Sequence, residues 1–306
     1  MEQPLITIVM PVYNRAAIVP RTLCSIERQT QRPLNVIIVD NNSTDGTVEV
    51  IDAWRRRVEA PDFQVTVLSE TTPGAAAARQ KGLAAVTTPY VAFFDSDDDM
   101  PPDHIATLTR HLADNDIDIL RFHGERIGLD GGRRQIGARP ECSLFNHLFH
   151  CILSTQLYVV RTELIKKAGG WDPSVLCWND FELGVRLLLK SQNVKWTNDT
   201  KVKVIAQAES ITGNGFKSKR GMWEHSLDVI ERNIREAGRP ELLKWVDTRR
   251  VQLAAEYARE GDHRAAKELL RQTLASSPHR LRLRLLYRSH LTFGRGTAIV
   301  ARLLFW

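Results

Sequence analysis

The first hundred residues alternate between two patterns of apolar side chains, and this alternation limits the fold more than any other feature. Four apolar runs have the length of strands: LITIVMPVY, LNVIIVD, FQVTVLSE and PYVAFFD. Three stretches between them have apolar residues at helical spacing: RTLCSIERQT, TDGTVEVIDAWRRRV and GAAAARQKGLAAV. Apolar strands joined by helices are typical of a parallel sheet covered by helices on both faces. We therefore predict an α/β fold with a mostly parallel sheet.

Polar clusters follow three of these strands directly. They are Pro11–Asn14, Asp40–Asp45 and Asp95–Asp99. Parallel strands place their carboxyl ends at one edge of the sheet, where open α/β folds bind ligands. One polar loop after a strand means little, but three at the same edge predict a binding crevice.

The third cluster, DSDDD, concentrates carboxylates at the end of an apolar strand, where like charges repel. A bound cation or a solvated turn would each relieve this repulsion. Asp95 and Asp97 alternate along the chain and can point the same way if it is extended. They would then offer hard oxygen ligands to Mn²⁺ or Mg²⁺, with a diphosphate completing the shell. The position beside the other clusters favours the metal, and Asp98 and Asp99 are assigned to the following turn and helix cap.

The other two clusters also have two interpretations each. Asp40 ends its strand, where it can accept hydrogen bonds from a base or a ribose, while Ser43, Thr44 or Asp45 is expected to cap the next helix. Tyr13 in PVYNR is either a surface residue of a tight turn or a ring that stacks on a planar base.

The pattern weakens after residue 100. We expect a helix in PPDHIATLTRHLADND, a strand in DIDILRFHGERI, a mobile turn-rich loop in GLDGGRRQIGARP and an amphipathic helix in CWNDFELGVRLLLK. Residues 223–275 are predicted to be mostly helical. They include VQLAAEYAREGDHRAAKELLRQTLASSP, which resembles one tetratricopeptide hairpin and must pack on a neighbour.

The net charge of +6 is located in the C-terminal tail. No acidic residue follows Glu268, whereas seven arginines do, so residues 1–268 carry a net charge of about −1. A nearly neutral body argues against nucleic acid as a partner. The tail, HRLRLRLLYRSHLTFGRGTAIVARLLFW, either lies on an anionic membrane surface near a lipid-linked acceptor or packs its leucines on the hairpin and exposes its arginines.

The remaining composition indicates a cytoplasmic protein, peripheral to the inner face of the membrane if the tail binds there. The four cysteines have no CxxC spacing, as expected for reduced thiols. The N-terminus lacks the pattern of a secretory signal, and no apolar run approaches the ~20 residues that span a bilayer.

Taken together, the motifs TIVMPVYNR, VIIVDNNSTDGT, PGAAAARQKGL and VAFFDSDDDMPPDHI resemble glycosyltransferase family 2 over roughly residues 5–110. The resemblance implies a Rossmann-like GT-A fold and the inverting, non-processive transfer of a hexosyl or N-acetylhexosaminyl group. The donor would be a nucleotide sugar, and the acceptor a hydroxyl of a glycan or a lipid-linked saccharide. The absence of a QxxRW pattern and of membrane spans argues against a processive polymerase.

The resemblance also assigns roles to residues of the first half. Pro11, Tyr13 and Asp40 would hold the nucleotide base, and Arg79 would reach toward the nucleotide. Asp95 would contact the ribose, and Asp97 would ligate Mn²⁺ or Mg²⁺ on the diphosphate. The same assignment divides the chain into a GT-A domain, 1–220, and a helical region with the basic tail, 221–306. Within the GT-A domain, residues 1–100 would bind the nucleotide and 101–220 the acceptor.

Two departures from the family pattern occur in the second half. Asp180, at the start of the amphipathic helix, would be the general base, although Asn179 or Asp180 could equally be a helix cap. Asn179 stands where relatives often carry an acid. Gln207 stands where they often carry a metal-binding histidine, so it is at most a weak metal ligand.

These departures keep two rival functions open. A non-catalytic sugar- or nucleotide-binding scaffold would explain both substitutions and the hairpin. A nucleotidyltransferase would share the sheet and the acidic metal site, but it usually needs a glycine- and lysine-rich segment after its first strand, and PVYNRAAIV lacks one.

Overall fold

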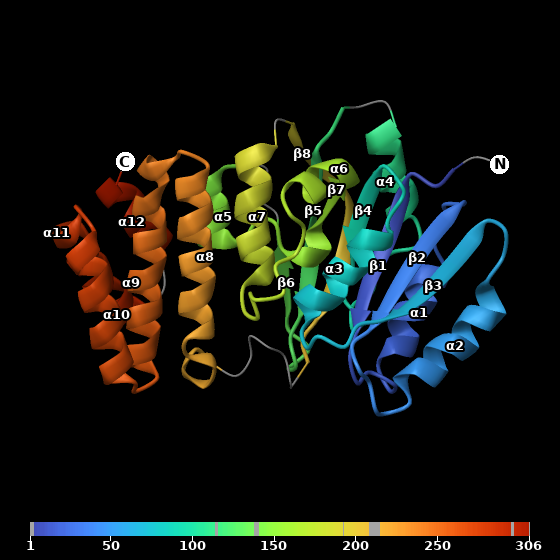
Figure 1. The fold of residues 1–306 in the computed structure, drawn as a ribbon, viewed down its shortest axis with the longest axis horizontal. Helices are drawn as coiled ribbons and strands as arrows, with labels where there is room; N and C mark the ends of the chain where they lie inside the picture. The colour runs from blue at the N-terminus through green and yellow to red at the C-terminus, as the bar shows by residue number, and fades with distance from the viewer. Residues whose placement is uncertain are drawn as a thin grey trace. The chain divides into compact units, whose positions relative to one another are not determined.

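A single sheet organises the first of two structural units (Figure 1). The described residues form eight strands in the order β3-β2-β1-β4-β7-β5-β6, with β8 paired to β5. The strands are β1 Ile6–Val12, β2 Leu34–Asp40, β3 Phe63–Ser69, β4 Tyr90–Phe93, β5 Ile119–Ile127, β6 Arg133–Ile136, β7 Tyr158–Arg161 and β8 Val194–Ile205. This unit comprises residues 1–142 and 152–208.

The structure is a computed structural model. It describes residues 3–113, 116–137, 141–191, 193–207, 215–294 and 297–305.

The predicted α/β architecture is confirmed. β1 lies between β2 and β4 and is parallel to both, and β3 continues the parallel part of the sheet. Every side chain of β1 is buried, as expected for a central strand covered on both faces. β7 is antiparallel to β4 and to β5, so the sheet is mixed beyond β4.

Helices cover both faces of the sheet because successive strand residues point to opposite sides. Ile6, Ile8 and Met10 of β1 share one core with α1 Val19–Glu27, α2 Thr47–Val58 and α4 His104–Ala113. Val9 belongs to the opposite core, which contains α3 Ala75–Ala85, α6 Thr162–Lys167 and α7 Asn179–Lys190. The core helices that carry site residues, α3 and α7, therefore pack on the same face.

One element of the second half was predicted wrongly. The segment 128–140 was expected to be a mobile loop, but Arg133–Ile136 forms β6, antiparallel to β5. The side chains of β6 are mostly exposed, so the strand depends on pairing with β5 and not on an apolar pattern that the sequence would reveal. Residues 138–140 of the predicted loop lie outside the described residues.

The second unit comprises residues 143–151 and 209–306 and, among its described residues, is helical. Its α-helices are α5 Leu144–His150, α8 Met222–Glu236, α9 Leu243–Arg259, α10 His263–Ser276, α11 Arg280–Phe293 and α12 Thr297–Phe305. The predicted hairpin is present as α9 and α10. Gly261 turns the chain with a φ of 83°, and Asp262 accepts a hydrogen bond from the backbone N–H of Ala265 at 3.0 Å.

The structure bears on some of the expectations about the chain as a whole and leaves others untested. Among the described residues, no helix combines the length and the apolar character that crossing a bilayer requires. The four cysteines are free thiols. The cytoplasmic location and the functional division at residue 220 stay predictions.

A buried ion pair fixes the helix that carries Asp180. Glu182 of α7 is 1% exposed and accepts two hydrogen bonds of 2.6 Å from Arg186, one turn later. The same guanidinium donates to the carbonyl oxygens of Ala168 and Gly170 at 2.5 and 2.7 Å. α7 is thereby attached to the end of α6.

We predict that Glu182→Ala lowers the free energy of unfolding by about 3 kcal/mol, because it leaves the largely buried Arg186 without its anion. The matched control is Glu163→Ala, which breaks an exposed pair with Lys167 at the same spacing and is expected to change stability little. Urea denaturation followed by circular dichroism measures both. Equal midpoints for the two variants would contradict the assigned role of the buried pair.

Candidate functional site

The carboxyl ends of β1, β2 and β4 meet at one edge of the sheet, as predicted. Val12 of β1 is in register with Asp40 of β2. Val9 pairs with Phe93 of β4, and the backbone N–H of Phe94 donates to the carbonyl of Val9 at 3.0 Å. The loops after the three strands therefore begin side by side.

The first two loops are joined by hydrogen bonds from side chains to backbone. Asn14 donates its backbone N–H to Ser43 Oγ at 2.9 Å, and its Oδ1 accepts from the N–H of Thr44 at 2.8 Å. Asp45 accepts from the N–H groups of Ala16, at 3.0 Å, and Thr47, at 3.1 Å. The N-cap of α2 is Gly46, so the expectation that Ser43, Thr44 or Asp45 caps this helix is wrong. Asp45 instead bonds to the first residue of α2 and to the loop after β1, and so joins the two.

Three of the predicted nucleotide-binding residues lie at the ends of β1 and β2 or in the loop that follows β1. Pro11 is buried within β1, and Asp40 is buried at the end of β2, where its carboxylate accepts from the N–H of Ser43 at 3.2 Å. Tyr13 is 56% exposed. Tyr13 follows Val12, the residue paired with Asp40, and the role of these residues in binding a base stays a prediction.

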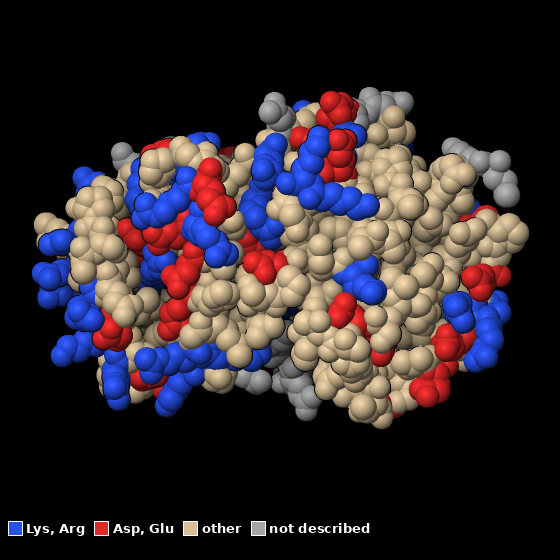
Figure 2. All heavy atoms as spheres, in the orientation of Figure 1, with Lys and Arg blue, Asp and Glu red and all other residues tan. Residues whose placement is uncertain are grey.

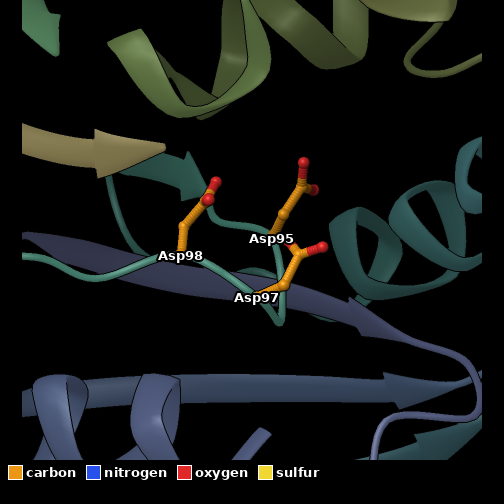
Figure 3. A group of neighbouring side chains, drawn as sticks. All are labelled: Asp95, Asp97 and Asp98. Carbon is orange, nitrogen blue, oxygen red and sulfur yellow. The ribbon is translucent and has the colours of Figure 1, made fainter. Parts of the chain in front are cut away.

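The acidic cluster lies in the loop after β4. Figure 3 shows the side chains of Asp95, Asp97 and Asp98 projecting from the same side of that loop. One carboxylate oxygen from each lies within 4.8 Å of the others. The loop is a tight turn, in which the N–H of Asp98 reaches the carbonyl of Asp95 at 3.4 Å. The turn brings residue 98 to the side on which residues 95 and 97 lie.

Asp98 is the member of the cluster that the sequence analysis missed. It had been assigned to a turn or cap, but it is 1% exposed, and its Oδ1 accepts from the backbone N–H of Ile205 at 2.9 Å. Its Oδ2 is buried without a hydrogen-bond partner among the described residues. Burial, and then the charges of Asp95 and Asp97, raise the pKa of Asp98 well above its ordinary value.

Asp99, in contrast, has a structural role. Its backbone pairs with that of Lys203 in β8, and its carboxylate forms ion pairs with Lys203 at 3.1 Å and Arg28 at 3.5 Å. Asp99 connects the loop to neighbouring elements and lies outside the group of three that could hold a metal.

The three carboxylates fit a divalent cation. Asp97 makes no ion pair with a residue that the structure describes, and burial followed by the charge of Asp95 raises its pKa. Oxygen atoms are the ligands that Mn²⁺ and Mg²⁺ prefer. The buried Oδ2 of Asp98 and the unpaired carboxylate of Asp97 are the donors a bound cation would satisfy.

Asp95 is held differently from its neighbours. Its Oδ1 accepts from Arg79 Nη2 at 2.6 Å, and its Oδ2 accepts from the side-chain amide of Gln156. Both of its oxygens thus have partners within the protein. Gln156 precedes β7 in a single turn of 3₁₀ helix, where no motif drew attention to it.

Arg79 connects the acidic loop to the start of α7. Arg79 is 5% exposed, and its guanidinium donates to Asn179 Oδ1 at 3.2 Å and lies over the ring of Trp171 at 4.7 Å. The nucleotide contact that was predicted for Arg79 stays a prediction. In the structure, the Arg79 side chain joins Asp95, in the loop after β4, to Asn179, at the start of α7. These two residues are far apart in the sequence.

Asp180 follows Asn179 and so lies beside this network. Its Oδ1 accepts from the N–H of Phe181 at 2.8 Å, and its Oδ2 lies 3.4 Å from Ser154 Oγ. Burial raises the pKa of Asp180, and the charge of Arg79 opposes that shift. The cap of α7 is Trp178, in the left-handed region, so neither Asn179 nor Asp180 is the helix cap.

Gln207 is two residues beyond the end of β8. Its side-chain amide donates to the carbonyl of Ile205 at 3.4 Å. The backbone N–H of Ile205 also donates to Asp98 of the acidic cluster, so Gln207 lies two residues along the chain from a residue that contacts this cluster. Metal ligation by Gln207 stays a prediction.

Comparison with known proteins gives a consistent result. The sequence model of glycosyl transferase family 2 matches residues 7–159. The glycosyltransferase GlyG of Streptococcus pneumoniae serotype 4 is 32% identical over 117 residues, which is 38% of this chain and 38% of GlyG. Three such curated relatives are matched over only 34% to 38% of their own length.

Two solved structures resemble the whole chain. Residues 1–349 of S. aureus TarS, in complex with UDP-GlcNAc, superpose with a TM-score of 0.73 at 17% identity and cover 98% of this chain and 90% of that one. The mannosyltransferase PcManGT from Pyrobaculum calidifontis, in complex with GDP-Man and Mn²⁺, has a TM-score of 0.56 at 20% identity, with coverages of 99% and 87%. These similarities confirm the predicted GT-A-like fold.

We predict that Asp98→Asn stabilises the metal-free protein at neutral pH. A carboxyl whose folded pKa is raised favours folding only while it is protonated. Its ionisation therefore destabilises the protein as pH rises from the unfolded pKa through the folded pKa. The amide keeps the Oδ1 acceptor for Ile205 without the charge, so a gain of at least about 1 kcal/mol is expected.

Asp99→Asn is the matched control, since Asp99 has cationic partners and its neutralisation should not stabilise the protein. Thermal unfolding in a chelating buffer at pH 5 and pH 8 measures both variants. The advantage of Asp98→Asn should be larger at pH 8, and a variant less stable than wild type at both pH values would contradict the prediction.

Proposed function

The chain belongs to glycosyl transferase family 2, and from this membership we propose that it transfers a sugar from a nucleotide-diphosphate sugar to a hydroxyl acceptor with inversion. The observation that carries the proposal is the network in which Arg79 joins Asp95 of the acidic loop to Asn179, the neighbour of Asp180. This network supports a single site that contains both the proposed metal ligands and the proposed base.

The donor is proposed to lie along the edge formed by the loops after β1, β2 and β4. Tyr13, Pro11 and Asp40 would hold the base, and Asp95 would contact the ribose. The two similar structures contain UDP-GlcNAc and GDP-Man with Mn²⁺, which supports a nucleotide sugar as the ligand and leaves both hexosyl and N-acetylhexosaminyl donors as candidates. Residues 1–100 would supply this half of the site.

Asp97 and Asp98 are proposed to hold the divalent cation, with Gln207 as a weak further ligand. When bound, the cation would offset the negative charge that develops on the diphosphate. Because Asp95 is already bonded to Arg79 and Gln156, its carboxylate is better suited to the ribose than to the metal.

Asp180 is proposed to be the general base. Its carboxylate would accept the proton of the acceptor hydroxyl while that oxygen attacks the anomeric carbon. The bond from the anomeric carbon to the diphosphate oxygen breaks in the same displacement, through a transition state of oxocarbenium character. Asn179, in place of an acid, accepts a hydrogen bond from Arg79 without adding a second negative charge beside the base.

The acceptor is proposed to be a glycan or a lipid-linked saccharide that enters through residues 101–220. Peripheral contact of the basic tail with a membrane would bring the chain to a lipid-linked acceptor. Nucleic acid is not proposed as a partner, because the excess of positive over negative charge lies in the tail and the rest of the chain is nearly neutral.

A non-catalytic sugar-binding scaffold is the second candidate, and the Asn179 and Gln207 substitutions favour it. A nucleotidyltransferase is the third, although its glycine-rich signature is missing. Incubation with UDP- and GDP-sugars and Mn²⁺, with release of the nucleoside diphosphate as readout, separates them. A scaffold would show no turnover, and a nucleotidyltransferase would act on nucleoside triphosphates and sugar phosphates.

We predict that UDP or GDP raises the melting temperature of the protein in the presence of Mn²⁺ but much less without it. Asp97→Asn should abolish the Mn²⁺-dependent part of the shift. Asp62→Asn is the control, because Asp62 is exposed just before β3, at the end of the strand opposite the site. Unchanged metal dependence in Asp97→Asn would exclude Asp97 as a ligand.

We predict that Asp180→Asn lowers turnover by about 10² to 10⁴, the range expected on loss of a general base, with donor binding retained. For the wild type, burial raises the pKa of Asp180, so the acid limb of the rate profile should lie above the ordinary aspartate range and turnover should rise with pH through it. Initial rates at saturating acceptor measure both effects. Normal turnover in Asp180→Asn would rule out its role as base.

A further inference from the structure

The outer surface of α11 combines exposed apolar side chains with unpaired arginines. Leu281 is 72% exposed, Leu285 is also exposed, and Phe293 at the end of the helix is 74% exposed. The helix is nevertheless anchored, because Leu283 and Leu286 are fully buried. One set of leucines thus packs inside the helical unit, as the packing interpretation of the tail expects, and another set faces solvent.

The exposed side chains of α11 form ordered rows. Leu281 and Leu285 are four residues apart and lie on one face of the helix. Arg284 and Arg288 form an adjacent row with the same spacing, and helical periodicity places Arg282 on the other flank of the leucines. The leucine row is therefore bordered by arginines on both sides.

α12 adds a second row of the same kind. Ile299 and Leu303, again four residues apart, are exposed, and Leu303 reaches 81%. α12 is close to α11 at Phe305, whose ring lies 5.9 Å from the guanidinium of Arg282. Together, these exposed rows on α11 and α12 make up what is called here the tail surface.

The charges of the tail surface come from arginines. Arg282, Arg284 and Arg288 make no ion pair with any residue in the part of the chain that the structure describes. No acidic residue follows Glu268 in the sequence. In Figure 2, the blue spheres of Lys and Arg are interspersed with tan surface along the margin where Figure 1 places α11.

We propose that the tail surface binds the headgroup region of an anionic lipid bilayer, with α11 lying in the plane of the interface. Exposed leucine and phenylalanine side chains would enter the boundary between headgroups and acyl chains, and the flanking arginines would contact lipid phosphates. This proposal rests on the proposed function in one respect: membrane binding would serve to bring the enzyme to a lipid-linked acceptor.

Charge separates this partner from the alternatives. A symmetric contact between two copies through α11 would place arginines against arginines, which costs energy unless anions intervene. A nucleic acid would match the arginines, but it offers no apolar region for a row of exposed leucines and a phenylalanine. An anionic bilayer satisfies both components of the surface.

Flotation of the full chain with vesicles tests the proposal. The protein should float with phosphatidylcholine vesicles that contain phosphatidylglycerol and remain at the bottom with phosphatidylcholine alone. Binding should weaken when salt is raised from about 0.15 M to about 1 M, because the screening length falls from ~8 Å to ~3 Å.

Two sets of substitutions examine the two components separately. The triple variant Arg282→Gln, Arg284→Gln, Arg288→Gln should bind on the order of 100-fold more weakly. Leu281→Gln with Leu285→Gln should lose about 10-fold or more. The control is Arg56→Gln, Arg110→Gln, Arg232→Gln, which removes the same charge from exposed positions on α2, α4 and α8 and should bind as wild type.

Several outcomes would overturn the proposal. They are failure of the wild type to float with anionic vesicles, equal loss in the control triple, and a dimer that the leucine variant dissociates in the absence of any vesicle binding. Release of nucleoside diphosphate from a soluble donor is measured in parallel and should be the same in all variants. Loss of vesicle binding with turnover intact concerns the tail surface alone, whereas absence of turnover in the wild type concerns the proposed function.

Discussion

The site depends on one buried guanidinium group, that of Arg79. Arg79 brings a full positive charge into the protein interior, and an unpaired charge there costs several kcal/mol. It is compensated by Asp95 at 2.6 Å, by the amide oxygen of Asn179 at 3.2 Å and by the face of Trp171 at 4.7 Å. These partners come from the loop after β4, from α7 and from the segment between α6 and α7. The guanidinium gains these partners only when the three are assembled. The start of α7, which carries the candidate base, is therefore held by the same side chain that holds the acidic loop.

The charges around the acidic loop also explain why a divalent cation suits it. Arg79 is already paired with Asp95, so it does little for Asp97 and Asp98. Arg15 and Arg21 lower the pKa of Asp97 only in part, and burial dominates. Two carboxyl groups in this loop therefore remain costly to ionise in the protein alone. A divalent cation removes that cost, which couples metal binding to the ionisation of the loop.

The extent to which the sequence predicted this arrangement follows from the range of each interaction. The sheet edge was predictable because apolar periodicity shows that strands end near Val12, Asp40 and Phe93, and parallel pairing brings these ends to the same edge. Asp98 was missed because the alternation rule assumes an extended chain, whereas the loop turns after Asp95. Gln156 and β6 were missed for another reason, since each is defined by a partner distant in sequence and carries no local pattern of its own.

The distribution of charge gives the two units different chemistry. At the sheet edge, three carboxylates lie close together and the nearby Arg79 is already paired with Asp95. This edge can therefore bind a further cation. The tail surface contains several arginines, and no acidic residue follows Glu268 in the sequence. This surface can therefore bind anions. If arginines such as Arg284 and Arg288 stood in the loop after β4, they would pair with Asp97 and Asp98 and compete with the metal. Confining them to α11 keeps the acidic loop available to a cation and leaves the arginines available to a negatively charged surface.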